Sequence, residues 1–228
     1  MLKKLFNIYR FLFPKSKVIF NDLQRIYPIS TMFGFDRGTP IDRYYIENFL
    51  SANSKFITGK VLEIGDNIYT LKYGNKNVKS EVLGFDKTSP NVTIIGDLTK
   101  METLPNKEID CFICTQTYNF IYDVKKAIKG SYYILKEKGT LLGTVSGISQ
   151  ISRYDMDKWG DYWRFTDKSI RILLEEAGFK NINVYPMGNV LASIAFLQGV
   201  VIEDMPKKQL LNKHDKDYQL TICFTAIK

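Results

Sequence analysis

The stretch GKVLEIGDNIYTLKYG, residues 59–74, decides the fold of this chain. Its first part is a short apolar run that ends at Gly65, as a buried strand does when it brings the backbone close to a nucleotide. A dinucleotide site would continue with a G-x-G-x-x-G fingerprint, because a pyrophosphate sits against bare backbone and a helix N-terminus. Here Asp66 follows Gly65, and the other glycines are missing. The stretch predicts either a cofactor loop of another kind or an ordinary strand and turn.

Strand-like and helix-like segments alternate along the rest of the chain. Apolar runs typical of strands cover residues 81–86, 91–97, 109–116, 140–145, 181–186 and 217–227. Helical spacing covers residues 39–53, 124–135 and 166–177, with Thr39 and Thr166 as predicted caps and Gly178 as a predicted stop, and residues 190–205 are expected to be partly helical. This alternation predicts an α/β domain with a mostly parallel sheet and helices on both faces.

The composition is that of one folded domain with an extension. Of the 228 residues, 45% are hydrophobic and 25% are charged, which excludes a disordered or fibrous protein. We expect an N-terminal helical cap over residues 1–58 and one principal domain over residues 59–228. Cys111, Cys114 and Cys223 are predicted to be reduced core residues. No histidine or second cysteine pair completes a zinc site beside the first two, so we predict no metal site.

The formal net charge is +8, but the lysines are scattered, so we expect no nucleic-acid partner. The most basic apolar segment is MLKKLFNIYRFLFPK, residues 1–15, whose apolar residues form one stripe on helical spacing. Such a helix packs on its own domain or on a partner, or it lies on a membrane interface. No run approaches the roughly 18 apolar residues that cross a bilayer, and no secretory signal is visible. We therefore predict a cytoplasmic protein, either free or peripheral at the inner membrane face.

Polar residues or glycines stand where the predicted strands end. Because ligands bind beyond the carboxyl ends of parallel strands, the candidate cofactor contacts are Glu63, Gly65, Asp66, Asp86, Asp97, Leu98, Thr115 and Gln116. Carboxylates in such a row accept hydrogen bonds from ribose hydroxyls and from the adenine amino group. A single aspartate would predict little, since aspartates also favour loops and caps. The row as a whole favours an adenosine ligand.

Charge separates the adenosine cofactors. A carboxylate at Asp66 would repel a pyrophosphate, which disfavours NAD and FAD. S-Adenosylmethionine has no phosphate, and its sulfonium and ammonium groups are cationic, so Glu63 and Asp66 would attract it. The residues therefore favour S-adenosyl-L-methionine as the cofactor.

Motifs in the expected order resemble class I S-adenosylmethionine-dependent methyltransferases. VLEIG, residues 61–65, resembles the first-strand motif, and IIGDL, residues 94–98, resembles the segment whose acid faces adenine. FGFDRGTPIDRYYIENFL, GDLT, TQT and WGDYWRFT are similar to a bacterial group associated with surface-polysaccharide biosynthesis, and this similarity extends from residue 33 to the C-terminus. The resemblance implies a Rossmann-like three-layer sandwich, in which a mostly parallel seven-stranded sheet has its last strand antiparallel. It also implies an enzyme that methylates a sugar hydroxyl or glycan intermediate.

The chain departs from the family pattern at two places. The family has a second glycine where this chain has Asn67, and asparagine tolerates the left-handed backbone that keeps such a turn. Asp86 and Asn91 are so close that the usual helix between the second and third strands is expected to be short or lost.

Methyl transfer requires donor and acceptor to be aligned away from water, and an oxygen acceptor normally needs a base. The predicted catalytic candidates are Asp161 and His214. The predicted acceptor contacts are Arg37, Arg43, Tyr44, Tyr154, Trp159, Trp163 and Arg164, which offer cations and flat rings.

Three alternatives stay open. The first alternative is a local ion-pair network, instead of a binding wall, among Asp36, Arg37, Asp42 and Arg43. Asp155, Asp157 and Asp161 either face water or bind a divalent ion. The third alternative is that the chain as a whole acts as a non-catalytic, cofactor-binding or scaffolding module of a membrane-associated biosynthesis complex.

Overall fold

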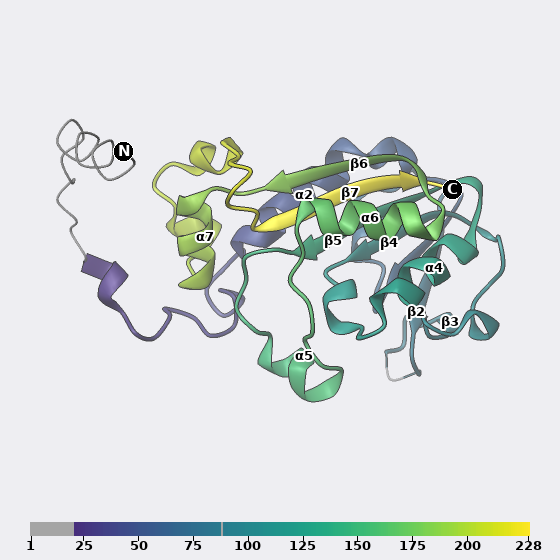
Figure 1. The fold of residues 1–228 in the computed structure, drawn as a ribbon, viewed down its shortest axis with the longest axis horizontal. Coiled ribbons are helices and arrows are strands. Elements are labelled where there is room, and N and C mark those ends of the chain that lie inside the picture. Colours follow the sequence, from purple (N-terminus) through teal and green to yellow (C-terminus); the bar gives the residue numbers. More distant parts are fainter. Residues whose placement is uncertain (1–20, 88) are drawn as a thin grey trace, which may run out of the picture.

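The computed structural model describes residues 21–87 and 89–228. Its strands are β1 (Lys60–Ile64), β2 (Lys79–Gly84), β3 (Ile94–Ile95), β4 (Ile109–Thr115), β5 (Leu135–Ser146), β6 (Lys180–Met187) and β7 (Thr221–Ile227). They form one sheet in the order β3-β2-β1-β4-β5-β7-β6 (Figure 1). β7 pairs antiparallel with both of its neighbours, and the pairs from β3 to β5 are parallel. The predicted Rossmann-like fold is confirmed.

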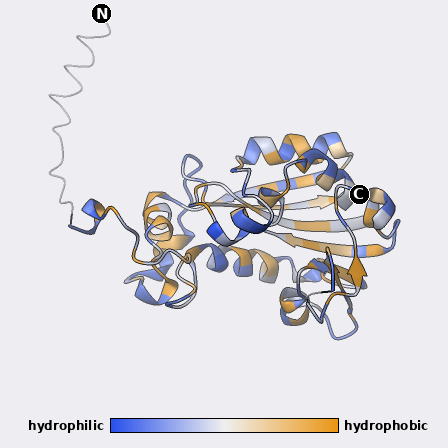
Figure 2. Ribbon diagram, turned by 90° about the horizontal axis from the view of Figure 1, so that it is seen from below, coloured by the Kyte–Doolittle hydropathy of each residue, from blue (hydrophilic) through white to orange (hydrophobic). Residues whose placement is uncertain are grey.

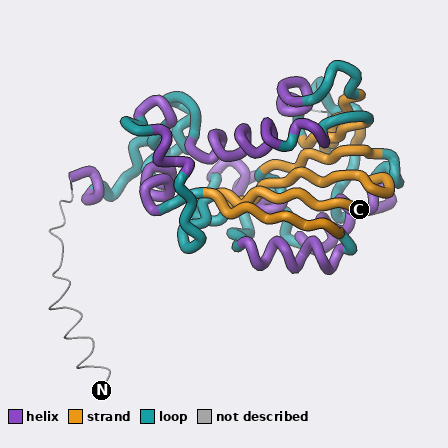
Figure 3. The backbone as a smooth tube through the Cα atoms, turned by 90° about the horizontal axis from the view of Figure 1, so that it is seen from above, coloured by secondary structure: helices purple, strands orange, loops and turns teal. Residues whose placement is uncertain are grey.

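Helices cover both faces of this sheet, as Figure 3 shows. The described α-helices are α2 (Ile41–Ala52), α3 (Ile68–Tyr73), α4 (Val124–Ile134), α5 (Arg153–Lys158), α6 (Asp167–Ala177) and α7 (Val190–Leu197). α4 and α6 pack on one face, and α2 and α3 pack on the other. Among the described residues, no helix is long and apolar enough to cross a membrane.

The strands are buried on both faces because their residues alternate between two cores. In β4, Phe112 and Cys114 belong to the core under α4 and α6, whereas Cys111 and Ile113 belong to the core under α2. Figure 2 shows this as apolar colour along the central strands, with mixed colour on the helices. The predicted core cysteines are confirmed, since Cys111, Cys114 and Cys223 are buried and free.

Local signals hold at some helix ends and fail at others. The Thr166 side chain accepts a hydrogen bond from the Ser169 N–H, and Gly178 ends α6 in the left-handed conformation, as predicted. Thr39 does not cap α2: Pro40 occupies that position, and the Thr39 hydroxyl donates to Glu203 at 2.8 Å. The reason is tertiary, because the segment after α7 packs beside the start of α2.

The strand boundaries differ from the sequence expectations at β3 and β5. β3 has only two residues, and the described residues between it and β2 form no helix, as the close spacing of Asp86 and Asn91 predicted. β5 begins at Leu135 and runs through the expected turn at residues 136–139. Lys138 has a positive φ of 65°, and the β4–β5 register shifts there. The residues expected to form a turn therefore form an irregular part of the strand.

Candidate functional site

Two cavities lie along the edge where the parallel strands end. The larger, about 660 Å³, opens beyond β1, β2 and β3. The smaller, about 210 Å³, opens beyond β4 and β5 and reaches the start of α2. Phe120 and Asp155 line both, so the cavities adjoin one another. This pairing gives the sheet edge one large compartment and one small polar one.

Four of the predicted cofactor residues line the large cavity: Gly65, Asp86, Asp97 and Leu98. Gly65 has a φ of +80°, which disfavours a side chain, and a Cβ built on it would have no neighbour within 4 Å. The left-handed position of the turn is therefore Gly65. Asn67, which was expected to supply it, has a φ of −125° and stands at the N-cap of α3. The bare backbone at Gly65 leaves free space at the cavity wall.

Asp97 shapes the loop after β3. Its Oδ1 accepts from the Thr99 N–H at 2.8 Å and from the Thr99 hydroxyl at 2.7 Å. Another part of the wall of this cavity is aromatic: Phe85 and Trp159 stack with ring centroids 5.3 Å apart, and Tyr122 and Tyr162 also line it. A cavity lined by both a polar loop and aromatic rings suits a ligand with a flat ring and hydroxyl groups.

Glu63 and Asp66 line neither cavity. The Glu63 carboxylate is 4% exposed and accepts from the Thr70 N–H, the Tyr69 N–H and the Thr70 hydroxyl at 2.8 to 3.2 Å. Asp66 accepts from the Ile68 N–H at 3.0 Å. Both carboxylates thus bind free N–H groups in the first turn of α3, which places that helix against β1.

The buried Glu63 predicts a pH dependence of stability. Burial raises its pKa from 4.5 to about 7, so the folded state holds the proton more tightly than the unfolded state does. The free energy of unfolding should then fall as pH rises through this range, by up to about 3 kcal/mol. In Glu63→Gln this contribution disappears. Urea unfolding across pH 4.5 to 8 should give a flatter profile for the variant, and parallel profiles would contradict the assignment.

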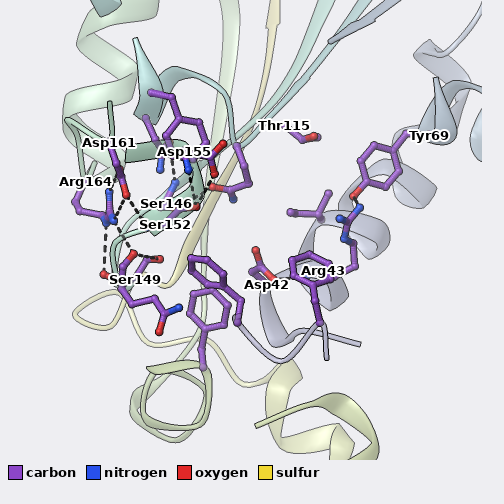
Figure 4. A pocket seen from close by; sticks show the side chains of 18 residues that line it. Asp42, Arg43, Tyr69, Thr115, Ser146, Ser149, Ser152, Asp155, Asp161 and Arg164 are labelled. Atoms are coloured by element: carbon purple, nitrogen blue, oxygen red, sulfur yellow. Dashed lines mark hydrogen bonds and ion pairs between the residues drawn. The ribbon is translucent and has the colours of Figure 1, made fainter. Parts of the chain in front are cut away.

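The small cavity is built around the end of β4 (Figure 4). Thr115 and Gln116, two predicted cofactor residues, line it. Gln116 has a positive φ of 49°, a strained conformation of the kind that functional sites store. Its Oε1 accepts from the Ser146 hydroxyl at 2.7 Å, whereas its buried Nε2 has no partner. An unpaired buried donor is costly unless a ligand completes it.

Arg43 and Asp42, at the start of α2, line the same cavity (Figure 4). The Arg43 guanidinium lies between the rings of Phe35 and Tyr69, 5.6 and 5.4 Å from their centroids, and donates to the Tyr69 hydroxyl. Burial raises the pKa of Asp42 to about 6 against the lowering effect of Arg43. The sequence suggested Asp42 only as part of an ion-pair network, and its position in the helical first turn gave no catalytic signal.

The predicted ion-pair network within residues 36–43 does not describe the contacts of Asp36 and Arg37, whose partners lie outside this segment. Arg37 pairs with Asp204 at 3.0 Å, and Asp36 accepts from the Ser30 hydroxyl. Arg37 lines neither cavity, whereas Arg43 lines the small one.

Asp161 and His214, the predicted catalytic pair, occupy different surroundings. Asp161 lines the small cavity, but its carboxylate binds Arg164 through two contacts of 2.5 and 2.9 Å and also accepts from the Ser152 N–H. These bonds fix the segment between β5 and α6 rather than leave a free base. His214 lines neither cavity: it packs edge-on against Tyr45, its Nδ1 accepts from the Gly188 N–H, and burial lowers its pKa.

The predicted acceptor residues divide among several places. Arg43 and Arg164 line the small cavity, and Trp159 lines the large one. The other four line neither cavity: Arg37, Tyr44, Tyr154 and Trp163. Tyr44 donates to Asn212, and the Trp163 indole donates to the Ile121 carbonyl. Within residues 21–87 and 89–228, no group of three metal-ligating side chains is present around Asp155, Asp157 and Asp161 or elsewhere.

Comparison with known proteins gives structural neighbours only. No protein-family model and no curated protein sequence matches the chain. A SAM-dependent methyltransferase from Archaeoglobus fulgidus superposes with a TM-score of 0.54 at 12% identity, covering 82% of this chain and 94% of that one. One from Mesorhizobium loti gives 0.54 at 14% identity, covering 82% and 98%.

A third neighbour was solved with a bound ligand. The phosphoethanolamine N-methyltransferase 2 of Haemonchus contortus, in complex with S-adenosyl-L-methionine, gives a TM-score of 0.54 at 17% identity. The match covers 95% of this chain and 61% of that one. At these identities the neighbours establish a shared fold and no more.

Proposed function

We propose that this protein is an S-adenosylmethionine-dependent methyltransferase that binds its cofactor in the large cavity and its acceptor in the small one. The observation that carries the proposal is the pair of adjoining cavities beyond the strand ends, one walled by Gly65 and Asp97 and the other by Asp42, Arg43 and Gln116. The shared fold of the methyltransferase neighbours supports it.

The residues of the large cavity fit this cofactor. The open space at Gly65 allows the ligand to approach the backbone, and Asp97 and Asp86 stand on neighbouring loops where an adenosine offers hydroxyl and amino donors. In the adjoining small cavity, the unpaired Nε2 of Gln116 offers a buried donor. S-Adenosylmethionine, when bound, supplies an electrophilic methyl group to the acceptor.

The chain's own residues divide the remaining work. Asp42 holds the place of a proton acceptor in the small cavity, and its raised pKa suits a base that works near neutral pH. Arg43 is held by two rings and the Tyr69 hydroxyl, so it is pre-oriented to bind an acceptor oxygen. Phe33, Phe35 and Phe196 give the cavity an apolar side.

The acceptor we propose is a sugar hydroxyl or a glycan intermediate of polysaccharide biosynthesis. The small cavity combines hydroxyl and amide groups with aromatic rings, which is the lining that sugars favour. The hydroxyl and amide groups of that lining include those of Asn119, Ser146, Ser149, Gln150 and Ser152. The sequence motifs that resemble the polysaccharide-associated group point to the same acceptor class.

A second candidate function is a cofactor-binding or scaffolding module without catalysis. It is favoured by the basic, apolar segment at residues 1–15, which lies outside the described residues and offers a contact to a membrane or a partner. In this case the protein works at the cytoplasmic membrane face as part of a biosynthesis complex.

Transfer of a labelled methyl group separates the two functions. The protein is incubated with methyl-labelled S-adenosylmethionine and with nucleotide sugars or glycan extracts, and the products are tested for label. An enzyme transfers label to at least one acceptor and releases S-adenosylhomocysteine. Binding of the cofactor without transfer to any acceptor would favour the scaffold, and absence of binding would refute both.

A further inference from the structure

The outer face of α7 is apolar. The helix, VLASIAFL, has no charged residue, and Ala192, Ala195 and Phe196 on its inner face are buried. Its outer side chains are Val190, Leu191, Ile194 and Leu197, which are 38 to 48% exposed. A helix on the surface of a water-soluble domain normally presents polar residues outward. This face therefore has the composition of a contact surface.

The apolar area continues onto the first described residues. A groove of about 360 Å³ lies between α7 and the segment that begins at Asn21, and it is lined by Leu23, Ile29, Leu191 and Ile194 among others. Between Leu23 and Ile29, the side chains of Ile26 and Tyr27 are 85 and 75% exposed. We call the area around this groove the α7 surface, defined by Leu23, Val190, Leu191, Ile194 and Leu197.

The charges beside the α7 surface indicate the kind of partner that covers it. The two acids in the groove are each paired, Asp22 with Arg25 at 3.8 Å and Asp204 with Arg37 at 3.0 Å. The chain that enters the groove at Asn21 is preceded by residues 1–20, which contain no Asp or Glu. Its cations are Lys3, Lys4, Arg10, Lys15 and Lys17. An apolar face joined to a purely basic segment matches the chemistry of an anionic lipid surface.

We propose that the α7 surface lies on an anionic lipid bilayer, with its apolar side chains among the headgroups and the preceding basic segment attracted to the lipid charge. Phe196, on the opposite side of the same helix, lines the small cavity. The contact therefore places that cavity close to the bilayer. The proposal adds the folded domain itself to the membrane contact and does not depend on methyl transfer.

Vesicle co-sedimentation of the full chain tests the α7 surface. The probes are vesicles of phosphatidylcholine alone and of phosphatidylcholine mixed with phosphatidylglycerol. The test variant, Leu191→Ser with Ile194→Ser, changes exposed side chains only. The matched control, Ile68→Ser with Leu71→Ser on α3, changes side chains that are 56 and 70% exposed outside this surface. Circular dichroism and calorimetric titration with S-adenosylmethionine check that each variant is folded and report cofactor binding separately.

The wild-type protein should bind the mixed vesicles, in a salt-sensitive manner, and bind the uncharged vesicles poorly. The α7 variant should bind the mixed vesicles roughly tenfold or more weakly, because two apolar side chains leave the interface, and the α3 control should bind like the wild type. Three results would each overturn the proposal: equal binding by the α7 variant, no binding by the wild type, or a wild-type dimer in light scattering that the α7 variant converts to monomer.

Discussion

Asp42→Asn should lower the turnover number for methyl transfer by about 10²- to 10⁴-fold, the usual contribution of a positioned base. Asparagine keeps the size of the side chain and its hydrogen bond from the Arg43 N–H, which is 2.7 Å long in the wild type. It cannot take a proton. Cofactor binding should change little, because Asp42 lines the small cavity and not the large one. The assay uses the acceptor found with labelled methyl donor.

The pH profile distinguishes a base from a structural residue. Burial raises the pKa of Asp42 to about 6, and a base acts when it is ionised, so wild-type turnover should rise with pH through this value. This rise of turnover with pH should be absent in Asp42→Asn. Tyr69, which interacts with Asp42, does not titrate in this range, because burial raises the pKa of its hydroxyl. Glu47→Gln, five residues further along α2, is the matched control and should keep both the turnover number and its rise with pH. If the turnover of Asp42→Asn still rose with pH through this value, Asp42 would be excluded as the base.

Gly65→Ala should weaken S-adenosylmethionine binding by about tenfold or more. The added methyl group meets no protein atom within 4 Å, so it occupies ligand space at the wall of the large cavity. The positive φ of Gly65 also makes any side chain there cost of order 1 kcal/mol in stability. Isothermal titration calorimetry measures the dissociation constant of the folded variant.

Gly178→Ala separates backbone strain from lost ligand space. Gly178 also has a positive φ, +103°, but it ends α6 away from both cavities. The two alanine variants should lose similar stability, and only Gly65→Ala should lose affinity. Equal dissociation constants for wild type and Gly65→Ala would place the cofactor elsewhere.

The sheet could be predicted from the sequence because its strands carry their own signals. β4 is apolar at nearly every position, as burial on both faces requires, and α6 has both a capping threonine and a terminal glycine. The start of β5 could not be predicted, since residues 136–139 have turn composition. In the fold they lie between Leu135 and Thr140, which both pair with β4, and Lys138 and Gly139 exchange backbone hydrogen bonds with Lys228 just after β7. Local propensity yields to such tertiary contacts.

The candidate site was predicted in position but not in every role. Strand ends placed Gly65, Asp97 and Gln116 at one edge of the sheet, because parallel strands deliver their ends together. Glu63 shows the limit: the motif cannot reveal that its carboxylate turns back to α3. Asp42 shows the converse, since only the folded chain brings the start of α2 against the end of β4.

A crystal structure of the protein with S-adenosylhomocysteine tests the central claim most directly. We expect the adenosine in the large cavity, with its ring and ribose between Gly65, Asp97 and the aromatic wall, and the amino-acid end directed toward Thr115 and Gln116. The small cavity, with Asp42 and Arg43, should then lie open beside the sulfur atom. Electron density for the ligand in the small cavity alone, or outside both cavities, would contradict the account.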